Sequence, residues 1–260
     1  MNRMPPTPKE LMAIFISRQI ENDFFVSLGA NLPVCTAGIF LAHLTRAPDL
    51  RIHAMGLYLN LAGVDRIEEL NQVSAPLLAK HAEAASSLED GFYFLARMHI
   101  NFFGAMQLDQ YGNGNLIGIG PDPRQMKARG PGSVGTSTIG ATVINFYYWV
   151  GSHTARVFVK ECDYVSTVGW YQGGDSRQRL GLPGGGPAYV LSPKAVMDFD
   201  DETRRMRLKY LVPGVTLEDV VANTGFELVI PGPVEVLPEP TMDEITVLRE
   251  RVDPYGLLRK

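Results

Sequence analysis

The stretch Leu50-Arg-Ile-His-Ala-Met-Gly-Leu-Tyr-Leu-Asn60 decides the fold. It predicts a short buried strand that runs into a tight turn at Gly56, and Pro48 ends the helical segment before it. In α/β proteins, reacting groups lie where a strand opens into such a turn, at the carboxyl edge of the sheet. Ala54 and Met55 occupy this tip, so the tip carries no acid, thiol or hydroxyl group.

Composition and charge restrict the class of protein. The chain has 260 residues, 45% of them hydrophobic, which is enough for one large α/β domain or two small ones. Its 24 basic residues are scattered among 28 acidic ones, so we expect no nucleic-acid partner. No window reaches the roughly 18 apolar residues of a membrane span, so we expect no membrane partner either. The two cysteines, Cys35 and Cys162, and the lack of a signal core favour a cytoplasmic protein.

Helical and strand patterns alternate along the chain. The run Thr7-Pro8-Lys9-Glu10 predicts a capped helix start, followed by a strand over 23–28 and a helix over 34–46. The later pattern predicts a helix over 65–86, strands over 141–150 and 156–160, an exposed loop over 175–186, and short antiparallel strands over 188–191, 195–199 and 206–210. No linker interrupts the chain. We therefore expect one α/β domain over residues 1–260, a mostly parallel sheet flanked by helices with an antiparallel extension.

Self-sufficient catalytic motifs are absent from the sequence. The histidines and cysteines have no metal-ligand spacing, and the glycine-rich segment 129–135 lacks the ending of a phosphate-binding loop. Strand alternation points His53 away from Ala54, so a core position is favoured for it, and a structural role is favoured for His153. Cys35 on an apolar helix is interpreted as core. We therefore expect an active site that another chain completes.

Seven motifs follow one another between about residues 9 and 255. They are Gly-Ala-Asn-Leu-Pro (29–33), Ala-Pro-Asp (47–49), Gly-Ala-Met-Gln-Leu-Asp-Gln-Tyr-Gly-Asn (104–113), His-x-x-Arg-x-Phe-Val (153–159), Gly-Gly-Gly-Pro (184–187), Pro-Gly-Val-Thr-Leu-Glu-Asp-Val (213–220) and Thr-Gly-Phe (224–226). In this order and spacing they resemble the β subunits of class I CoA-transferases, close to the group of the glutaconate CoA-transferase β subunit. The resemblance implies a NagB/RpiA-like CoA-transferase fold, an α subunit as partner, and an acyl-CoA substrate at the junction. It implies no permanent cofactor and no metal, with coenzyme A present as part of the substrate.

The residue at position 54 departs from the family pattern. In the transferases that the chain resembles, a glutamate in a Glu-Ser/Asn-Gly pattern attacks the thioester, whereas this chain has Ala54-Met55-Gly56. Alanine cannot be acylated, so the resemblance implies the pocket without its nucleophile. Family members that lack this glutamate open a ring in steroid-derived CoA thioesters by hydrolysis, or decarboxylate a methylglutaconyl-CoA-like substrate. Segments 104–113 and 149–159 are most similar to the ring-opening group.

Both chemistries need hydrogen-bond donors where an enolate develops on the thioester oxygen. The backbone around Gly56 and Gly132 and the side chains of Asn31 and Gln107 would supply them, with Tyr58 facing the acyl group. The predicted substrate-binding residues are therefore Asn31, Ala54, Met55, Gly56, Tyr58, Gln107 and Gly132.

Several alternatives stay open from the sequence. Met55 and Leu57 would line an apolar wall, whereas turn stabilisation is an equal alternative for Gln107 and Asn113. The main acid and base would come from the α subunit. A hydrolytic or carbon–carbon bond-cleaving enzyme is the leading hypothesis, and its rivals are a transferase with a substitute carboxylate, a decarboxylase and a non-catalytic scaffold. Both an αβ and an α2β2 assembly fit the sequence.

Overall fold

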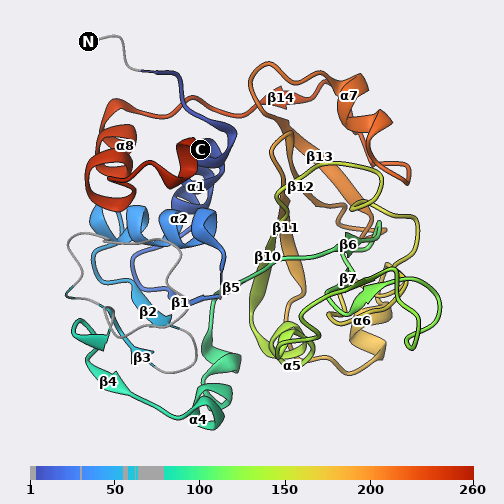
Figure 1. Cartoon of the computed structure of the whole chain (residues 1–260), viewed down its shortest axis with the longest axis horizontal. Helices are drawn as coiled ribbons and strands as arrows, with labels where there is room; N and C mark the ends of the chain where they lie inside the picture. Colours follow the sequence, from blue (N-terminus) through green and yellow to red (C-terminus); the bar gives the residue numbers. More distant parts are fainter. Residues whose placement is uncertain (1–3, 30, 55–57, 62, 64–78) are drawn as a thin grey trace. The chain divides into compact units, whose positions relative to one another are not determined.

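The computed structural model describes residues 4–29, 31–54, 58–61, 63 and 79–260. The chain divides into two compact units, one formed by Met1–Phe102 with Pro238–Lys260 and the other by Phe103–Leu237. Each unit carries both helices and strands (Figure 1). The single domain expected over residues 1–260 stays a prediction.

Five strands form the sheet of the first unit, in the order β5-β1-β2-β3-β4. Their bounds are β1 Phe25–Leu28, β2 Arg51–Ala54, β3 Tyr58–Leu59, β4 Ala84–Ala85 and β5 Ile100–Phe103. Strand β1 runs parallel to β2 and β5, while β3 pairs antiparallel with β2 and β4. The register places Leu28 beside Ala54, so the carboxyl ends of β1 and β2 lie at the same edge.

Two N-terminal helices, α1 (Pro8–Arg18) and α2 (Pro33–Leu44), pack against each other in the first unit (Figure 1). The predicted capping box begins α1: Thr7 Oγ1 accepts the Glu10 N–H, and the Glu10 carboxylate accepts the Thr7 N–H. Residues 10–17 of α1 are all buried, and each large apolar side chain among them contributes about 1.5–3 kcal/mol to folding. Two short helices, α4 (Leu88–Tyr93) and η1 (Leu95–Arg97), lead into β5.

The C-terminal segment completes the first unit. It contains α8 (Met242–Val247), η2 (Leu248–Val252) and η3 (Leu257–Arg259), and the predicted capping box of Thr241 and Glu244 begins α8. Thr7 Oγ1 donates to the Leu258 carbonyl over 2.8 Å. Residues 238–260 are therefore tied to the start of α1.

The second unit has five strands in the order β14-β13-β12-β11-β10. Their bounds are β10 Asn145–Trp149, β11 Pro187–Leu191, β12 Ala195–Phe199, β13 Met206–Leu211 and β14 Glu235–Val236. Strands β10 and β11 are parallel, whereas β11, β12 and β13 are antiparallel neighbours. The predicted antiparallel extension over 188–191, 195–199 and 206–210 is confirmed.

Smaller elements surround this sheet. Two hairpins pair β6 (Gln107–Leu108) with β7 (Gly114–Asn115) and β8 (Gly118–Ile119) with β9 (Ala128–Arg129). The helices of the unit are α5 (Thr136–Thr142), α6 (Ser176–Arg179) and α7 (Leu217–Ala222).

The α/β prediction is confirmed, and three local predictions are wrong. Residues 156–160 form no strand, because only one isolated bridge, from Phe158 to Leu108, ties them to a neighbour. Ala84–Ala85 forms strand β4, since pairing with β3 outweighs the helix propensity of alanine. The loop over 175–186 contains α6 and a buried arginine, Arg177. Most of the helix predicted over 65–86 lies outside the described residues.

Among the described residues, no helix is long and apolar enough to cross a membrane. Both cysteines, Cys35 and Cys162, are free and buried. The described part of the chain contains no group of three or more His, Cys, Asp or Glu side chains placed to hold a metal ion.

Candidate active site

The carboxyl ends of β1 and β2 hold the first group of predicted site residues. Ala54 ends β2 and is completely buried, beside Leu28 of β1 and opposite Tyr58 of β3. Directly opposed residues of antiparallel strands share a face, so the half-buried Tyr58 side chain lies on the face of Ala54. The methyl group of Ala54 gives this strand end no nucleophile. Outside the described residues lie Met55, Gly56 and Leu57.

Asn31 stands in the loop between β1 and α2. Its φ of 54° is in the left-handed region, which asparagine adopts more readily than most residues. It is exposed, and its side-chain amide has no hydrogen-bond partner in the described part of the chain. The loop therefore presents Asn31 as a free polar group near the end of β1.

His53 and Cys35 are core residues, as the sequence predicts. The His53 ring lies 6.1 Å from the Phe25 ring and 6.3 Å from the Phe94 ring, measured between centroids. Burial lowers the pKa of His53, and neither ring nitrogen has a hydrogen-bond partner among the described residues. Burial raises the pKa of the Cys35 thiol far out of the range of a nucleophile.

Gln107 has one end of its side chain fixed and the other free. Its Oε1 accepts from the Asp163 N–H over 3.0 Å and from Asn115 Nδ2 over 2.6 Å. A backbone N–H can only donate, so the atom that faces Asp163 is the oxygen and the amide orientation is settled. The Nε2 group has no hydrogen-bond partner among the described residues, although Gln107 as a whole is only 5% exposed. Nε2 is not one of the fully buried unpaired atoms, so it keeps access to solvent and is open to an acceptor.

Asn115 holds Gln107 in place and was not predicted from the sequence. It is completely buried, and its Oδ1 accepts from the N–H groups of Ile117 (2.8 Å) and Gly118 (3.3 Å). Its Nδ2 donates to Gln107 and to the Gly118 carbonyl, over 2.8 Å in the second case. The only signal in the sequence was its place at the end of Gly112-Asn-Gly-Asn, where a turn role is the simpler interpretation.

The backbone of the loop around Gly132 differs from the prediction. The Gly132 N–H donates to the Leu116 carbonyl over 3.1 Å, so it is not free for a substrate. Val134, two residues later, has a φ of 47° and is 62% exposed. A β-branched residue in the left-handed region carries about 1–3 kcal/mol of strain, and such strain collects at functional sites. This loop therefore stays a candidate through Val134 and the open space over Gly132, where an added Cβ would meet no atom within 4 Å.

Asn113 serves the turn that precedes β7. Its Nδ2 donates to Asp109 Oδ2 over 2.7 Å and to the Tyr171 carbonyl over 2.9 Å, and its Oδ1 accepts from the Gly169 N–H over 2.9 Å. Burial raises the pKa of Asp109, against the lowering effect of the bonds from Asn113 and Tyr111. All three bonds of the Asn113 amide are internal, so the turn-stabilising alternative is confirmed for this residue.

His153 is also structural, as predicted. Its Nδ1 lies 2.8 Å from Ser192 Oγ and its Nε2 lies 3.1 Å from Thr224 Oγ1. The ring stacks on Phe158 with centroids 4.2 Å apart. Burial and, to a smaller extent, the charge of Lys194 lower the pKa of His153 to about 4.

A buried arginine orders the glycine-rich loop before β11. Arg177 is 2% exposed, and its guanidinium donates to four backbone carbonyls, those of Gly140, Val168, Gly169 and Gly184. No carboxylate pairs with Arg177 among the described residues, and four of its five donors bind backbone oxygens. Nothing in the spacing of this arginine distinguished it from a solvated one.

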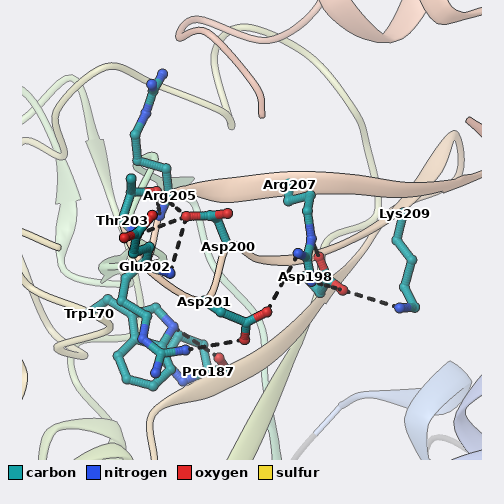
Figure 2. A network of polar contacts seen from close by, with 11 residues as sticks. Trp170, Pro187, Asp198, Asp200, Asp201, Glu202, Thr203, Arg205, Arg207 and Lys209 are labelled. Carbon is teal, nitrogen blue, oxygen red and sulfur yellow. Dashed lines mark hydrogen bonds and ion pairs between the residues drawn. The ribbon is translucent and has the colours of Figure 1, made fainter. Parts of the chain in front are cut away.

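A polar network lies on the turn between β12 and β13 (Figure 2). Asp198 accepts from Arg207 Nε over 2.7 Å and from Lys209 Nζ over 3.2 Å. Asp200 accepts from Thr203 through both the backbone N–H (2.8 Å) and the hydroxyl (2.7 Å), and these bonds lower the pKa of Asp200. The charged groups of this network pair with one another. The network therefore stabilises the turn and is not a candidate site.

Comparison with known proteins gives a consistent result. The family model described as Coenzyme A transferase matches residues 9–223. The B subunit of glutaconate CoA-transferase from Acidaminococcus fermentans is 34% identical over 95% of this chain and 93% of its own length. The crystal structure of glutaconate coenzyme A-transferase from that organism superposes with a TM-score of 0.86 at 33% identity, over 98% of both chains.

A second relative matches over part of its length. The cholesterol ring-cleaving hydrolase IpdB subunit of Rhodococcus jostii is 35% identical over 62% of this chain and 62% of its own length. The full-length matches and the family model agree with the resemblance inferred from the motifs. This chain belongs to the Coenzyme A transferase family.

Proposed function

We propose that this chain is the B-type subunit of a heteromeric enzyme that acts on acyl-CoA thioesters. The enzyme would break a carbon–carbon bond of the acyl group by hydrolysis rather than transfer CoA. The observation that carries the proposal is Ala54, the completely buried residue at the end of β2. Its methyl group cannot form the acyl-enzyme anhydride that a glutamate would form at this position. The similarity to a ring-cleaving hydrolase subunit supports the same conclusion.

The chemistry needs a donor more than a nucleophile in this chain. The bond that breaks joins the α carbon of the thioester to a neighbouring carbonyl carbon. Its electron pair moves to the α carbon and is delocalised onto the thioester oxygen. The hydroxyl group of water ends on the carbonyl carbon that is released. The free Nε2 of Gln107 is a fixed donor for the developing enolate oxygen, and such donors contribute about 2.7–4 kcal/mol each.

The acid and base for the proton transfers belong to the A-type partner in this proposal. The family relatives are named as B subunits, which supports a partner of the A type. Tyr58 and Asn31 would contact the acyl group and the thioester. The cytoplasmic location expected from the sequence stays a prediction.

A CoA-transferase is the second candidate, and a specific observation favours it. The relative that matches over 95% of this chain is named as a transferase subunit. Transfer through this chain would need a carboxylate other than residue 54, supplied by the partner. Trapping during turnover with hydroxylamine or borohydride would then label that carboxylate, and an unlabelled complex would contradict this candidate.

The deciding experiment uses the complex of this chain with its A-type partner. The complex is incubated with a panel of acyl-CoAs, with and without a second free acid, and the products are identified by mass spectrometry. A product that has gained the mass of water supports the proposal. Movement of CoA to the second acid would overturn it, loss of carbon dioxide would indicate a decarboxylase, and no effect of this chain on turnover would indicate a scaffold.

Two variants at position 54 sharpen the result. Ala54→Glu restores the residue type of the transferases, and Ala54→Gln is the matched control of equal size without a nucleophile. We expect neither to transfer CoA, because a side chain that replaces a completely buried methyl has no preformed space. Transfer by the Glu variant alone would mean that the rest of the transferase site is intact.

A further inference from the structure

Three cationic side chains gather on the hairpin of β8 and β9, in a chain whose net charge is −4. Arg124, Lys127 and Arg129 are all exposed. Arg124 lies 3.7 Å from Asp122, and Lys127 and Arg129 have no ion-pair partner among the described residues. We propose that this hairpin binds the phosphate groups of coenzyme A, which rests on the proposed function because it assumes an acyl-CoA ligand.

The hairpin holds these cations on a fixed frame. The Gly120 N–H donates to Asp163 Oδ2 over 2.7 Å, and the Tyr164 hydroxyl donates to the Gly120 carbonyl over 2.6 Å. The Lys127 N–H donates to the Ile119 carbonyl over 2.8 Å, which closes the turn. Binding to a fixed frame costs less conformational entropy than ordering a free loop, so the site is prepared for a ligand.

Lys127 and Arg129 are close together in the chain. Lys127 lies in the turn before β9, and Arg129 lies in β9 two residues later. Arg129 is directly opposite Gly118, which has no side chain to cover it. Beyond Arg129, the space over Gly132 is open. A polyanion can therefore approach both exposed cations.

The acidic groups nearby are already engaged. The Asp163 carboxylate accepts from Gly120, and Asp122 accepts from the Arg124 N–H over 2.8 Å as well as lying near its guanidinium. Neither carboxylate forms an ion pair with Lys127 or Arg129 among the described residues, so both cations are available to an anion. Three kinds of anion could bind here: free phosphate, a carboxylate of the acyl group and the phosphates of coenzyme A. The number and charge of its phosphates favour coenzyme A.

The hairpin begins at the residues that fix Gln107. Asn115 bonds to both the N–H and the carbonyl of Gly118, and to Gln107 on its other side. The segment from Asn115 to Gly120 spans at most about 18 Å. In coenzyme A the phosphates are separated from the thioester by the pantetheine arm, so one ligand can contact Gln107 with its thioester and the hairpin with its phosphates.

The test measures binding by calorimetry to the complex with the A-type partner. The probes are coenzyme A, dephospho-CoA and pantetheine, each at low and at high salt. The variant is the double replacement Lys127→Gln with Arg129→Gln, and Arg97→Gln is the control, since Arg97 is an exposed arginine of the first unit.

We expect the double variant to weaken coenzyme A binding by about tenfold or more and to reduce its salt dependence. Pantetheine binding should not change in either variant. The loss of affinity in the double variant should be smaller for dephospho-CoA than for coenzyme A. Equal coenzyme A affinity in the wild type and the double variant would overturn the proposal. So would equal salt dependence, or inorganic phosphate alone competing as well as coenzyme A does.

Failure of the proposed function gives a different result. Because binding is measured without turnover, a complex that binds coenzyme A through the hairpin but cleaves no acyl-CoA contradicts the reaction and supports the hairpin. A complex that cleaves acyl-CoA with an unchanged KM in the double variant supports the reaction and contradicts the hairpin.

Discussion

Asn115 donates its side-chain amide to Gln107 Oε1 over 2.6 Å, while the Asp163 N–H donates to the same oxygen over 3.0 Å. With both bonds on the oxygen, the Gln107 amide cannot rotate without leaving a buried donor unpaired. Its free Nε2 is therefore held in one direction before any ligand arrives. Preorganised donors of this kind are effective in catalysis because they need no rearrangement as charge develops.

Replacing Gln107 with Glu tests this donor directly. The variant keeps an oxygen for Asp163 and Asn115 but replaces Nε2 with a second oxygen, so the fold is retained and the donor is lost. We expect kcat for acyl-CoA cleavage to fall by about 10²–10³-fold, with a smaller change in KM. Steady-state kinetics of the complex with its A-type partner measure both.

Gln110→Glu is the matched control for that experiment. The Gln110 side chain accepts from Arg205 Nε over 3.1 Å and is not part of the candidate site. Its variant should keep wild-type kcat. A Gln107→Glu enzyme with wild-type kcat would mean that Gln107 only stabilises its turn, which is the other role that the sequence allows.

Val134→Gly should stabilise the protein. Glycine accepts the left-handed φ of 47° without the steric cost that valine carries, although it also gains freedom in the unfolded chain. We expect the free energy of unfolding to rise by about 1 kcal/mol in urea denaturation. Val165→Gly is the control, because Val165 is similarly exposed but has no positive φ, and it should lose stability. A loss in both variants would show that Val134 is not strained.

Arg249→Leu should be strongly destabilising. Arg249 holds the Glu10 carboxylate with bonds of 2.8 and 2.9 Å, and Glu10 is only 1% exposed. Burial raises the pKa of Glu10, but the bonds from Arg249 and Thr7 outweigh it, so the pKa is lowered overall. Removing the arginine leaves the buried carboxylate with only the Thr7 N–H and the more distant Arg259, whose Nε lies 3.9 Å away. We expect a loss near the lower end of the range of about 3–5 kcal/mol in the free energy of unfolding.

Two comparisons check this assignment by denaturant titration. Adding Glu10→Gln to Arg249→Leu should recover part of the loss, because the unpaired charge is removed. Arg179→Leu breaks the exposed pair with Asp175 and should cost no more than about 1 kcal/mol. Equal losses for Arg249→Leu and Arg179→Leu would contradict the argument.

His53→Phe should make stability less dependent on pH. Burial lowers the pKa of His53 in the folded chain below its unfolded value near 6.5. Between these two pKa values the unfolded chain binds more protons than the folded chain. The contribution to stability is complete above pH 6.5 and is lost as the pH falls through the folded pKa. The Phe variant should match or exceed wild-type stability at pH 7 and lose less of it by pH 5, in urea titrations at each pH.

His153 provides the internal reference for that experiment. Its pKa of about 4 predicts a loss of about 3 kcal/mol between pH 6.5 and 4, which remains in the His53 variant. A variant whose pH profile has the same slope as the wild type would mean that His53 is not a buried neutral group.

The elements that the sequence predicts well are those with local signals. The Thr7 and Thr241 capping boxes begin α1 and α8 as expected, because Thr and Glu three residues apart satisfy each other's backbone groups. The short runs 195–199 and 206–210, which tight polar turns join, likewise identified β12 and β13. The position of Ala54 at a strand end followed from the same local pattern.

What the sequence could not provide depends on contacts between distant segments. Ala84–Ala85 becomes a strand only because β3 is beside it, and the burial of Arg177 depends on carbonyls up to 37 residues away. The orientation of Gln107 is set by Asp163, 56 residues further along the chain. These relationships have no signature in spacing, so the candidate residues could be named from motifs but their free and committed atoms could not.

The tie between Arg249 and Glu10 has a consequence for protein synthesis. The first unit is discontinuous, since residues 238–260 complete what residues 1–102 begin. On the ribosome, helix α1 emerges with the Glu10 carboxylate long before its arginine exists. The continuous segment 103–237 can collapse during translation, whereas the first unit must wait for the last part of the chain. A message truncated before residue 238 would therefore leave α1 without its counter-charge and expose it to quality-control proteases.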